Sequence, residues 1–194
     1  MVILIGGVGN TGKTLLAHHL MVRYGITYLS VDHIKMGLFR GDPNCGFTPL
    51  DDSFELGEKL WPIIKGIIMT NIENRQNIII EGCYLLPHLM SDFETSYSDQ
   101  ILSIFLGFSA GYIRENHATE IASNRSAAED KDEQDDLETM LSDHHSMRTA
   151  CIENDSNYFE IASDYESEMK AVLQFVEKQL NERKDTLKTV DTYC

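Results

Sequence analysis

Lysine and arginine are scarce in this chain of 194 residues: there are 16 of them against 31 aspartates and glutamates, and the formal net charge is −15. Nucleic acids and anionic membrane surfaces bind proteins through clustered basic side chains. The shortage therefore argues against either as a partner. A few basic residues that converge locally would still suffice to bind a phosphorylated small molecule.

Cysteine is also rare, and no apolar run approaches the length of a membrane span. The cysteines form neither a C-x-x-C nor a metal-finger pattern, so we expect reduced thiols at Cys45, Cys83, Cys151 and Cys194. The N-terminus lacks the basic and apolar regions of a secretory signal. These absences predict a cytoplasmic protein, and the length suits a single domain, monomeric or homodimeric.

The chain does contain a complete G-x-x-x-x-G-K-[ST] match at residues 7–14, directly after the apolar residues 2–5. This pattern indicates a phosphate-binding P-loop, although a simple glycine turn between strand and helix is the alternative. Its three glycines can adopt positive φ and present backbone N–H groups to an anion. We expect the nucleotide to contact Gly7, Gly9, Asn10, Thr11, Gly12, Lys13, Thr14 and Leu15.

Within this motif, Lys13 would reach the β- and γ-phosphates of ATP, and the Thr14 hydroxyl would bind Mg²⁺. We expect Lys13 to be a surface cation beside the cradle. Helical spacing of apolar residues predicts a helix that ends near Gly25, followed by a strand at 27–30. Strand, loop, helix and strand form a βαβ unit, which implies a parallel sheet.

Asp32 follows the second predicted strand, at the edge of the sheet where ligands bind. We expect it to face the same crevice as Lys13 and to accept or orient the proton of an acceptor hydroxyl group. The alternative is a helix N-cap. Lys35 and Arg40 would hold an anionic acceptor, or would lie on a solvated helix face.

The stretch 41–52 is rich in proline, glycine, aspartate and asparagine and predicts a loop. A helix follows from Ser53, which Pro62 kinks or divides in two, and Trp61 is expected in the core. The apolar run 77–82 predicts a buried strand. A further helix is expected through about residue 96.

That strand ends in Glu81 and Gly82. Glu81 would hold a magnesium-bound water or bind the acceptor, and Gly82 would let a ligand approach. The alternative is an acidic side chain that points into solvent.

A fourth strand is expected at 100–107, followed by a helix at 109–123. The acidic segment 129–136 has the composition of a solvated surface, and its place between two helices suits a helical lid at about 114–150. Arginines in a lid would stabilise charge on the transferred phosphoryl group. The candidates are Arg125 as a catalytic residue, and Arg114 and Arg148; each is otherwise a surface residue.

Asp143, His144 and His145 resemble a metal site, but adjacent histidines on a helix point about 100° apart. No third ligand lies at a suitable spacing, so we reject a metal there. A fifth strand is expected at 158–162, and a last helix follows. The domain should span 1–183, with a polar, frayed tail at 184–194.

The motif at 7–14, Asp32 and the sequence Ile-Ile-Glu-Gly at 79–82 resemble the small-molecule kinases with a P-loop, a group that includes adenylate kinase, shikimate kinase and zeta-toxin-like kinases. The likeness extends to about residue 180. Residues 80–87 look most like 2-phosphoglycerate kinases, and they place Tyr84 among the acceptor-binding candidates.

The resemblance implies a three-layer α/β P-loop NTPase fold, with a five-stranded parallel sheet in the order 2-3-1-4-5 and a mobile lid. It also implies transfer of the γ-phosphate of Mg-ATP to a hydroxylated or phosphorylated metabolite. Adenylate kinases have an arginine where this chain has Lys35, and the lid segment here is acidic. Both departures count against the first alternative, a nucleoside monophosphate kinase. The second alternative is a nucleotide-binding switch or NTPase module.

Overall fold

The computed structural model describes residues 1–116 and 137–190, with only the backbone for 183–190. Its strands form a parallel sheet in the order β2-β3-β1-β4-β5, which confirms the predicted class and strand order. The strands are β1 (Val2–Gly7), β2 (Thr27–Ser30), β3 (Ile78–Glu81), β4 (Ile101–Phe108) and β5 (Asn157–Ile161).

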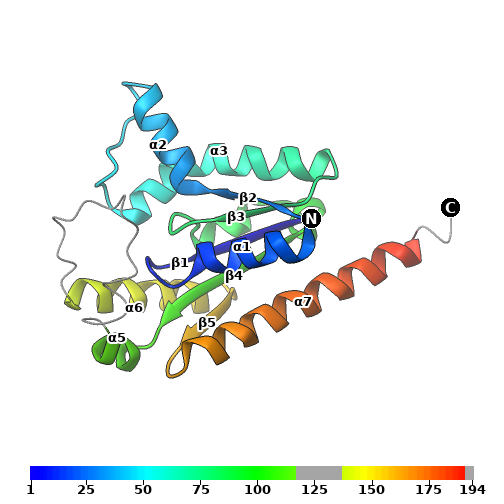
Figure 1. The fold of residues 1–194 in the computed structure, drawn as a ribbon. Helices are drawn as coiled ribbons and strands as arrows, with labels where there is room; N and C mark the ends of the chain where they lie inside the picture. The colour runs from blue at the N-terminus through cyan, green and yellow to red at the C-terminus, as the bar shows by residue number, and fades with distance from the viewer. Residues whose placement is uncertain (117–136, 191–194) are drawn as a thin grey trace.

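Helices cover both faces of this sheet, so the domain has three layers (Figure 1). One face carries α1 and α7, and the other carries α3 and α6, while α5 packs at the ends of β4 and β5. The helices are α1 (Lys13–Tyr24), α2 (Val31–Gly41), α3 (Ser53–Glu73), α4 (Thr95–Ser98), α5 (Ala110–Asn116), α6 (Leu137–Glu153) and α7 (Tyr165–Val190).

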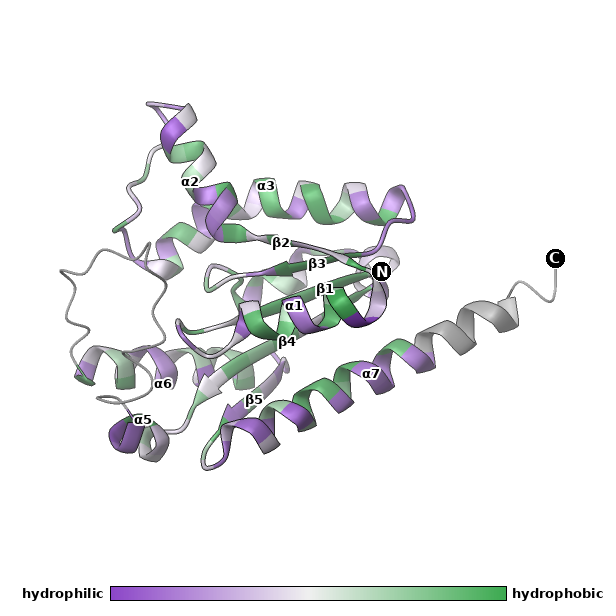
Figure 2. Cartoon of the chain, in the orientation of Figure 1, coloured by the Kyte–Doolittle hydropathy of each residue, from purple (hydrophilic) through white to green (hydrophobic). Residues whose placement is uncertain are grey.

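The central strand β1 shows why the layers form. Successive side chains of a strand point to opposite faces, and every residue of β1 is buried. Val2 and Leu4 join the core beneath α3 and α6, whereas Ile3 and Ile5 join the core beneath α1 and α7. Figure 2 shows the resulting pattern, with hydrophobic residues on the strands and on the inward sides of the helices. A continuous apolar run is therefore what a strand buried on both faces requires.

Two helices differ from the prediction. Pro62 lies inside the single helix α3 and does not divide it in two. Pro62 and Glu58 are both exposed, so water can solvate the carbonyl group that proline leaves without a donor. The helix expected after β3 is instead a 3-10 helix at Pro87–Asp92 followed by the short α4. Leu85 and Leu86, directly before the 3-10 helix, and Leu89 within it are buried in the core.

The last helix carries the predicted apolar stripe, with Val172, Val176 and Leu180 buried. It continues to Val190, so the expected frayed tail at 184–194 is helical over most of its length. Good helix formers after residue 181 explain the extension. Trp61 is in the core as predicted. Among the described residues no helix is both long and apolar enough to cross a membrane.

Candidate functional site

The P-loop connects β1 to α1, and its backbone adopts left-handed conformations at Gly7 (φ 120°), Asn10 (φ 62°) and Gly12 (φ 89°). Gly9, which we expected to share this conformation, does not; Asn10 takes it instead, as asparagine tolerates positive φ better than most residues. The loop is closely surrounded at both ends. A Cβ on Gly7 would collide with the Leu106 carbonyl oxygen, and one on Gly12 would collide with the Tyr165 hydroxyl group.

The middle of the loop is open, because nothing lies within 4 Å of a Cβ placed on Gly9. The N-terminus of α1 begins directly beyond it, at Lys13. An open concave backbone next to a helix N-terminus is the arrangement that binds phosphate groups. The geometry therefore suits the triphosphate that the motif predicts.

Side chains of the loop hold it in shape. Lys13 Nζ donates to the Val8 carbonyl oxygen at 2.5 Å, and Thr11 Oγ1 donates to the same oxygen at 2.9 Å. Lys13 is only 7% exposed, so it is folded onto the loop and is not the surface cation that we expected. Thr11 is fully buried and stabilises the loop through its hydroxyl, while Leu15 is exposed on α1.

A buried carboxylate lies beside Thr14. Glu81, at the carboxyl end of β3, is 2% exposed, and its Oε2 accepts a hydrogen bond from Thr14 Oγ1 at 3.2 Å. Its Oε1 is buried with no hydrogen-bond partner among the described residues. A buried carboxylate oxygen without a partner is unfavourable, and carboxylate and hydroxyl oxygens are the ligands that Mg²⁺ prefers. The pair thus fits a magnesium ion, directly or through a bound water.

This burial excludes the solvent-facing alternative for Glu81. We expected the neighbouring Gly82 to let a ligand approach, but the structure does not leave room for one there. A Cβ at Gly82 would lie 2.9 Å from the Cβ of Val31. The absence of a side chain at this position therefore lets the start of α2 pack closely against the end of β3.

Asp32, Lys35 and Tyr84 form a second group of side chains, which we call the acceptor-side triad. Lys35 Nζ lies 3.0 Å from Asp32 Oδ1, the Tyr84 hydroxyl donates to the same oxygen at 3.3 Å, and Lys35 also donates to the Tyr84 oxygen. Lys35 and Tyr84 are 7% and 5% exposed, whereas the Asp32 side chain is 52% exposed. The triad therefore holds a carboxylate in place while leaving part of it accessible.

The N-cap of α2 is Ser30, and Asp32 lies in the first turn of the helix, so the capping role that we considered for Asp32 is not observed. Burial, followed by the neighbouring Cys83 and Asp32, raises the pKa of the Tyr84 phenol. Tyr84 therefore remains a neutral donor at any ordinary pH.

The thiol of Cys83 is influenced by charges from both the P-loop and the acceptor-side triad. Burial raises the pKa of its thiol, while the charges of Lys13 and Lys35 lower it and that of Asp32 raises it. Residues of the P-loop and of the acceptor-side triad thus act on one side chain at the same edge of the sheet. That Asp32 and Lys13 face one crevice stays a prediction.

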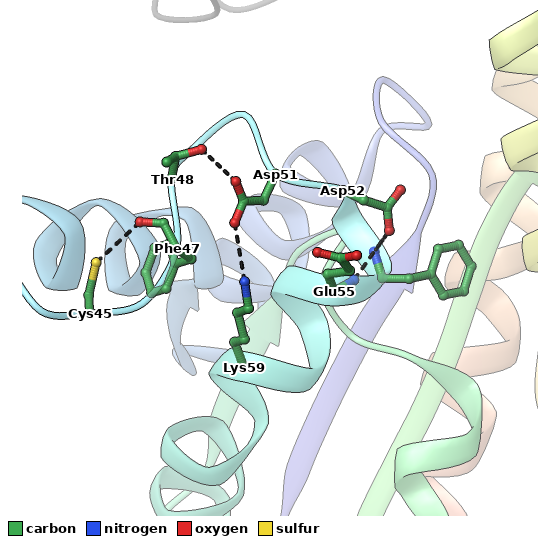
Figure 3. Close-up of polar contacts among 8 residues, drawn as sticks. Cys45, Phe47, Thr48, Asp51, Asp52, Glu55 and Lys59 are labelled. Atoms are coloured by element: carbon green, nitrogen blue, oxygen red, sulfur yellow. Dashed lines mark hydrogen bonds and ion pairs between the residues drawn. The ribbon is translucent and has the colours of Figure 1, made fainter.

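A pocket lies beside the P-loop, between the start of α3, Cys83 and α6. Its lining consists of Val8, Gly9, Asn10, Asp52, Ser53, Phe54, Cys83, Thr139, Met140, Asp143 and Met147. Figure 3 shows how the segment before α3 is held next to it: Asp52 caps α3 by accepting from the backbone N–H groups of Phe54 and Glu55, at 2.8 and 3.2 Å. Asp51 accepts from Thr48 at 2.6 Å and pairs with Lys59 at 3.2 Å. The loop that forms this wall is therefore well fixed.

None of the described arginines lines this pocket. Arg114 donates to the Ala110 carbonyl oxygen of its own helix, Arg148 pairs with Glu160 on β5 at 3.2 Å, and Arg40 is exposed in the last turn of α2. Arg125 and the acidic segment 129–136 lie outside the described residues. The expected lid at 114–150 also overlaps α6, which belongs to the body of the domain because its Met147 and Cys151 are buried in the core.

From the sequence we considered His144 only as a metal ligand and did not predict its burial against the end of β4. His144 is 3% exposed on α6, and its Nδ1 accepts a hydrogen bond from the Phe108 backbone N–H at 2.9 Å. The described residues contain no group of three or more histidine, cysteine, aspartate or glutamate side chains arranged to hold a metal ion. The burial of His144 could have been predicted from its spacing with Met140 and Met147, which places all three residues on one face of the helix.

No family model and no curated protein matches the chain. Among solved structures, it is similar to a protein described as a putative kinase from Chloroflexus aurantiacus (22% identity, 93% of this chain and 96% of that chain covered, TM-score 0.58). It is also similar to a gluconokinase from Sinorhizobium meliloti (15% identity, 94% and 96% covered, TM-score 0.54) and to shikimate kinase from Aquifex aeolicus (13% identity, 93% and 98% covered, TM-score 0.53). At these identities the likeness establishes the fold, and this chain has the fold of the P-loop kinases.

Proposed function

We propose that the protein is a small-molecule kinase that transfers the γ-phosphate of Mg-ATP to an acceptor hydroxyl group. The observation that carries the proposal is the placement of a partly exposed carboxylate, Asp32, at the same edge of the sheet as the P-loop. The similarity of the fold to a shikimate kinase and a gluconokinase supports it. A nucleotide-binding switch would not need an oriented carboxylate on the acceptor side.

The nucleotide side would work mainly through charge. The backbone N–H groups of the P-loop and the N-terminus of α1 would bind the phosphates, and Lys13 would leave the Val8 carbonyl oxygen to reach the β- and γ-phosphates. Thr14 and Glu81 would hold Mg²⁺, which neutralises charge on the phosphates when it is bound. The carboxylate oxygen of Glu81 that has no partner among the described residues would gain one there.

On the acceptor side, Asp32 would accept a hydrogen bond from the substrate hydroxyl and take its proton as the phosphoryl group is transferred. The neutral Tyr84 phenol and the Lys35 ammonium group both contact Oδ1 and would fix the carboxylate in position. In this role Lys35 positions Asp32 and is not the anion-binding cation that we first considered. The Lys35 ammonium group already forms an ion pair with the Asp32 carboxylate.

The test is a screen of Mg-ATP consumption against hydroxylated metabolites, phosphorylated metabolites and nucleoside monophosphates. The proposal expects one class of hydroxyl acceptor to stimulate consumption strongly and to yield a phosphorylated product by mass spectrometry. Stimulation by a nucleoside monophosphate alone would favour the nucleotide kinase alternative. Nucleotide binding with hydrolysis but no transfer to any acceptor would support the switch.

A further inference from the structure

The pocket beside the P-loop borders both halves of the site. Gly9 and Asn10 form one side of it, where the phosphate cradle is open, and Cys83, just beyond β3, forms another. Cys83 directly precedes Tyr84, whose hydroxyl group contacts Asp32. A molecule in the pocket therefore lies next to the open cradle and next to the chain segment that leads into the acceptor-side triad.

The size of the pocket limits what can bind there. Its volume of about 190 Å³ equals the space that about six water molecules occupy in the liquid. A short polyol or a single sugar ring fills such a volume. A nucleoside monophosphate, with its base, ribose and phosphate, is too large for it.

The charge of the pocket limits its ligands further. Asp52 at the N-terminus of α3 and Asp143 on α6 both line it, so negative charge lies on two of its walls. The lining formed by the described residues contains no lysine or arginine. A carboxylate or phosphate group would lose water there and meet charge of its own sign, whereas an ammonium group would meet opposite charge.

Asp52 also offers an oxygen that a ligand can use. Its Oδ1 alone accepts from the backbone N–H groups of Phe54 and Glu55, at 2.8 and 3.2 Å. Its Oδ2 has no hydrogen-bond partner within residues 1–116 and 137–190, and Figure 3 shows it pointing away from the helix end. The capping bonds thus orient this carboxylate before any ligand binds, which lowers the entropy lost on binding.

We propose that the acceptor is a compact hydroxylated amine, an amino alcohol or an amino sugar, whose ammonium group binds in the pocket at Asp52 and Asp143. The carbon skeleton would pack against the apolar part of the lining, which includes Phe54, Met140 and Met147. The inference rests on the proposed function and names the substrate class within it. It separates this protein from kinases that act on hydroxy acids or on phosphorylated metabolites.

The transfer step is that of the proposed function. The acceptor hydroxyl oxygen bonds to the γ-phosphorus, the bond from that phosphorus to the bridging oxygen of ADP breaks, and the hydroxyl proton passes to Asp32. The ammonium group takes no part in this exchange and serves only to bind the acceptor.

Two series of compounds of nearly constant size test the charge preference. Glucosamine, glucose and gluconate carry a positive charge, no charge and a negative charge, and so do serinol, glycerol and glycerate. With Mg-ATP, kcat/KM for phosphorylated product should fall in that order within each series. The amine should exceed the neutral compound by about tenfold or more, the value of one hydrogen bond between charged groups.

Binding is measured separately from transfer. In a proton–nitrogen NMR titration of the Mg-ADP complex, glucosamine should shift the backbone amides of Gly9, Phe54 and Thr139, which line the pocket. Asp52→Asn keeps the helix cap but removes the charge, so affinity for glucosamine should fall about tenfold and that for glucose less than about twofold. The matched control is Glu55→Gln, an exposed neighbour outside the lining, which should change neither affinity.

Asp143→Asn, on the wall formed by α6, should also weaken glucosamine more than glucose. A preference for gluconate or glycerate, equal use of all three charges, or no binding of either amine would overturn the inference and leave the kinase function in place. Wild-type affinity of both aspartate variants for glucosamine would overturn it as well. Transfer to no acceptor, here or in the wider screen, would instead refute the proposed function and the inference with it.

Discussion

The phosphate cradle on the nucleotide side is shaped by the backbone of one short stretch of chain, whereas the acceptor side is assembled from side chains that are distant in the sequence. The P-loop needs only residues 7–14 and close packing against Leu106 and Tyr165. The acceptor-side triad joins α2 to a residue 49 positions away, through the contact of Lys35 with Tyr84.

This difference has a chemical consequence. Backbone amides bind any phosphate in the same way, so the nucleotide side can be the same for many substrates. The acceptor side depends on which side chains meet, and small changes there alter the substrate or remove the activity. Substitutions on the two sides should therefore change different kinetic parameters of the enzyme, and measuring these parameters tests the comparison.

The largest effect is expected for Lys13→Ala on the nucleotide side. Loss of the cation that reaches the β- and γ-phosphates should reduce phosphoryl transfer by about 10²- to 10³-fold and weaken triphosphate binding. Transfer assays with calorimetric titration of Mg-ATP would measure both, and circular dichroism would check the fold. The control is Lys178→Ala, whose ammonium group is exposed on α7. Wild-type affinity for Mg-ATP in Lys13→Ala would contradict the P-loop assignment.

Next is Asp32→Asn on the acceptor side. The amide keeps the size of the side chain but removes its basicity, so transfer should fall by roughly 10²-fold, the typical contribution of a general base, with Mg-ATP affinity unchanged. Steady-state kinetics with the acceptor from the screen would show it. Asp155→Asn, in an exposed turn with φ of 49° that asparagine also tolerates, is the matched control. Transfer at the normal rate would remove Asp32 from the mechanism and leave Glu81 as the carboxylate to test.

Glu81→Gln should act on the metal. It removes the charge of the carboxylate next to Thr14 while keeping a carbonyl oxygen for the Thr14 hydroxyl, so the concentration of Mg²⁺ that half-saturates the reaction should rise by about 10-fold or more. A magnesium titration of the transfer rate at fixed ATP measures this. Glu160→Gln on β5, which breaks only the exposed pair with Arg148, should leave the magnesium dependence as in the wild type. An unchanged magnesium dependence in Glu81→Gln would rule out a role of this carboxylate at the metal.

The same comparison explains what the sequence could predict. The P-loop motif and the βαβ unit are recognised by local or general rules, and they predicted a parallel sheet. The order of the strands was implied by the resemblance to the P-loop kinases. Asp32 was identified because it directly follows a strand. These features depend on residues that are close in sequence or on the topology alone.

Features that depend on distant contacts were beyond sequence reasoning. Nothing near Lys35 in the sequence predicts that it contacts Tyr84. The sequence indicates only an anion-binding residue or a residue on a solvated helix face, and the burial of Lys35 contradicts the second. His144 was considered only as a metal ligand, because the Phe108 N–H that fixes its ring belongs to a strand far away in the sequence. The predicted solvent exposure of Lys13 was wrong for a different, local reason, because its ammonium group donates to the Val8 carbonyl oxygen within the folded loop.

The smallest effect is expected for Tyr84→Phe, which tests whether the acceptor-side triad works as a unit. The phenol is a neutral donor, since its pKa is raised by burial and by the nearby Cys83 and Asp32. Its removal leaves the ion pair of Lys35 with Asp32 at 3.0 Å, so the carboxylate keeps one of its two partners.

Transfer by Tyr84→Phe should therefore fall by about tenfold or less, the value of one hydrogen bond to a charged group, and the loss should appear in the acceptor kinetics while Mg-ATP affinity stays constant. Tyr97→Phe is the control, because it removes a hydroxyl that donates to Glu73 at 2.8 Å on the exposed surface. If Tyr84→Phe lost as much activity as Asp32→Asn, the phenol itself would contact the reacting groups. If it lost none, the Lys35 ammonium group alone would orient Asp32, and the acceptor side would be simpler than the three contacts suggest.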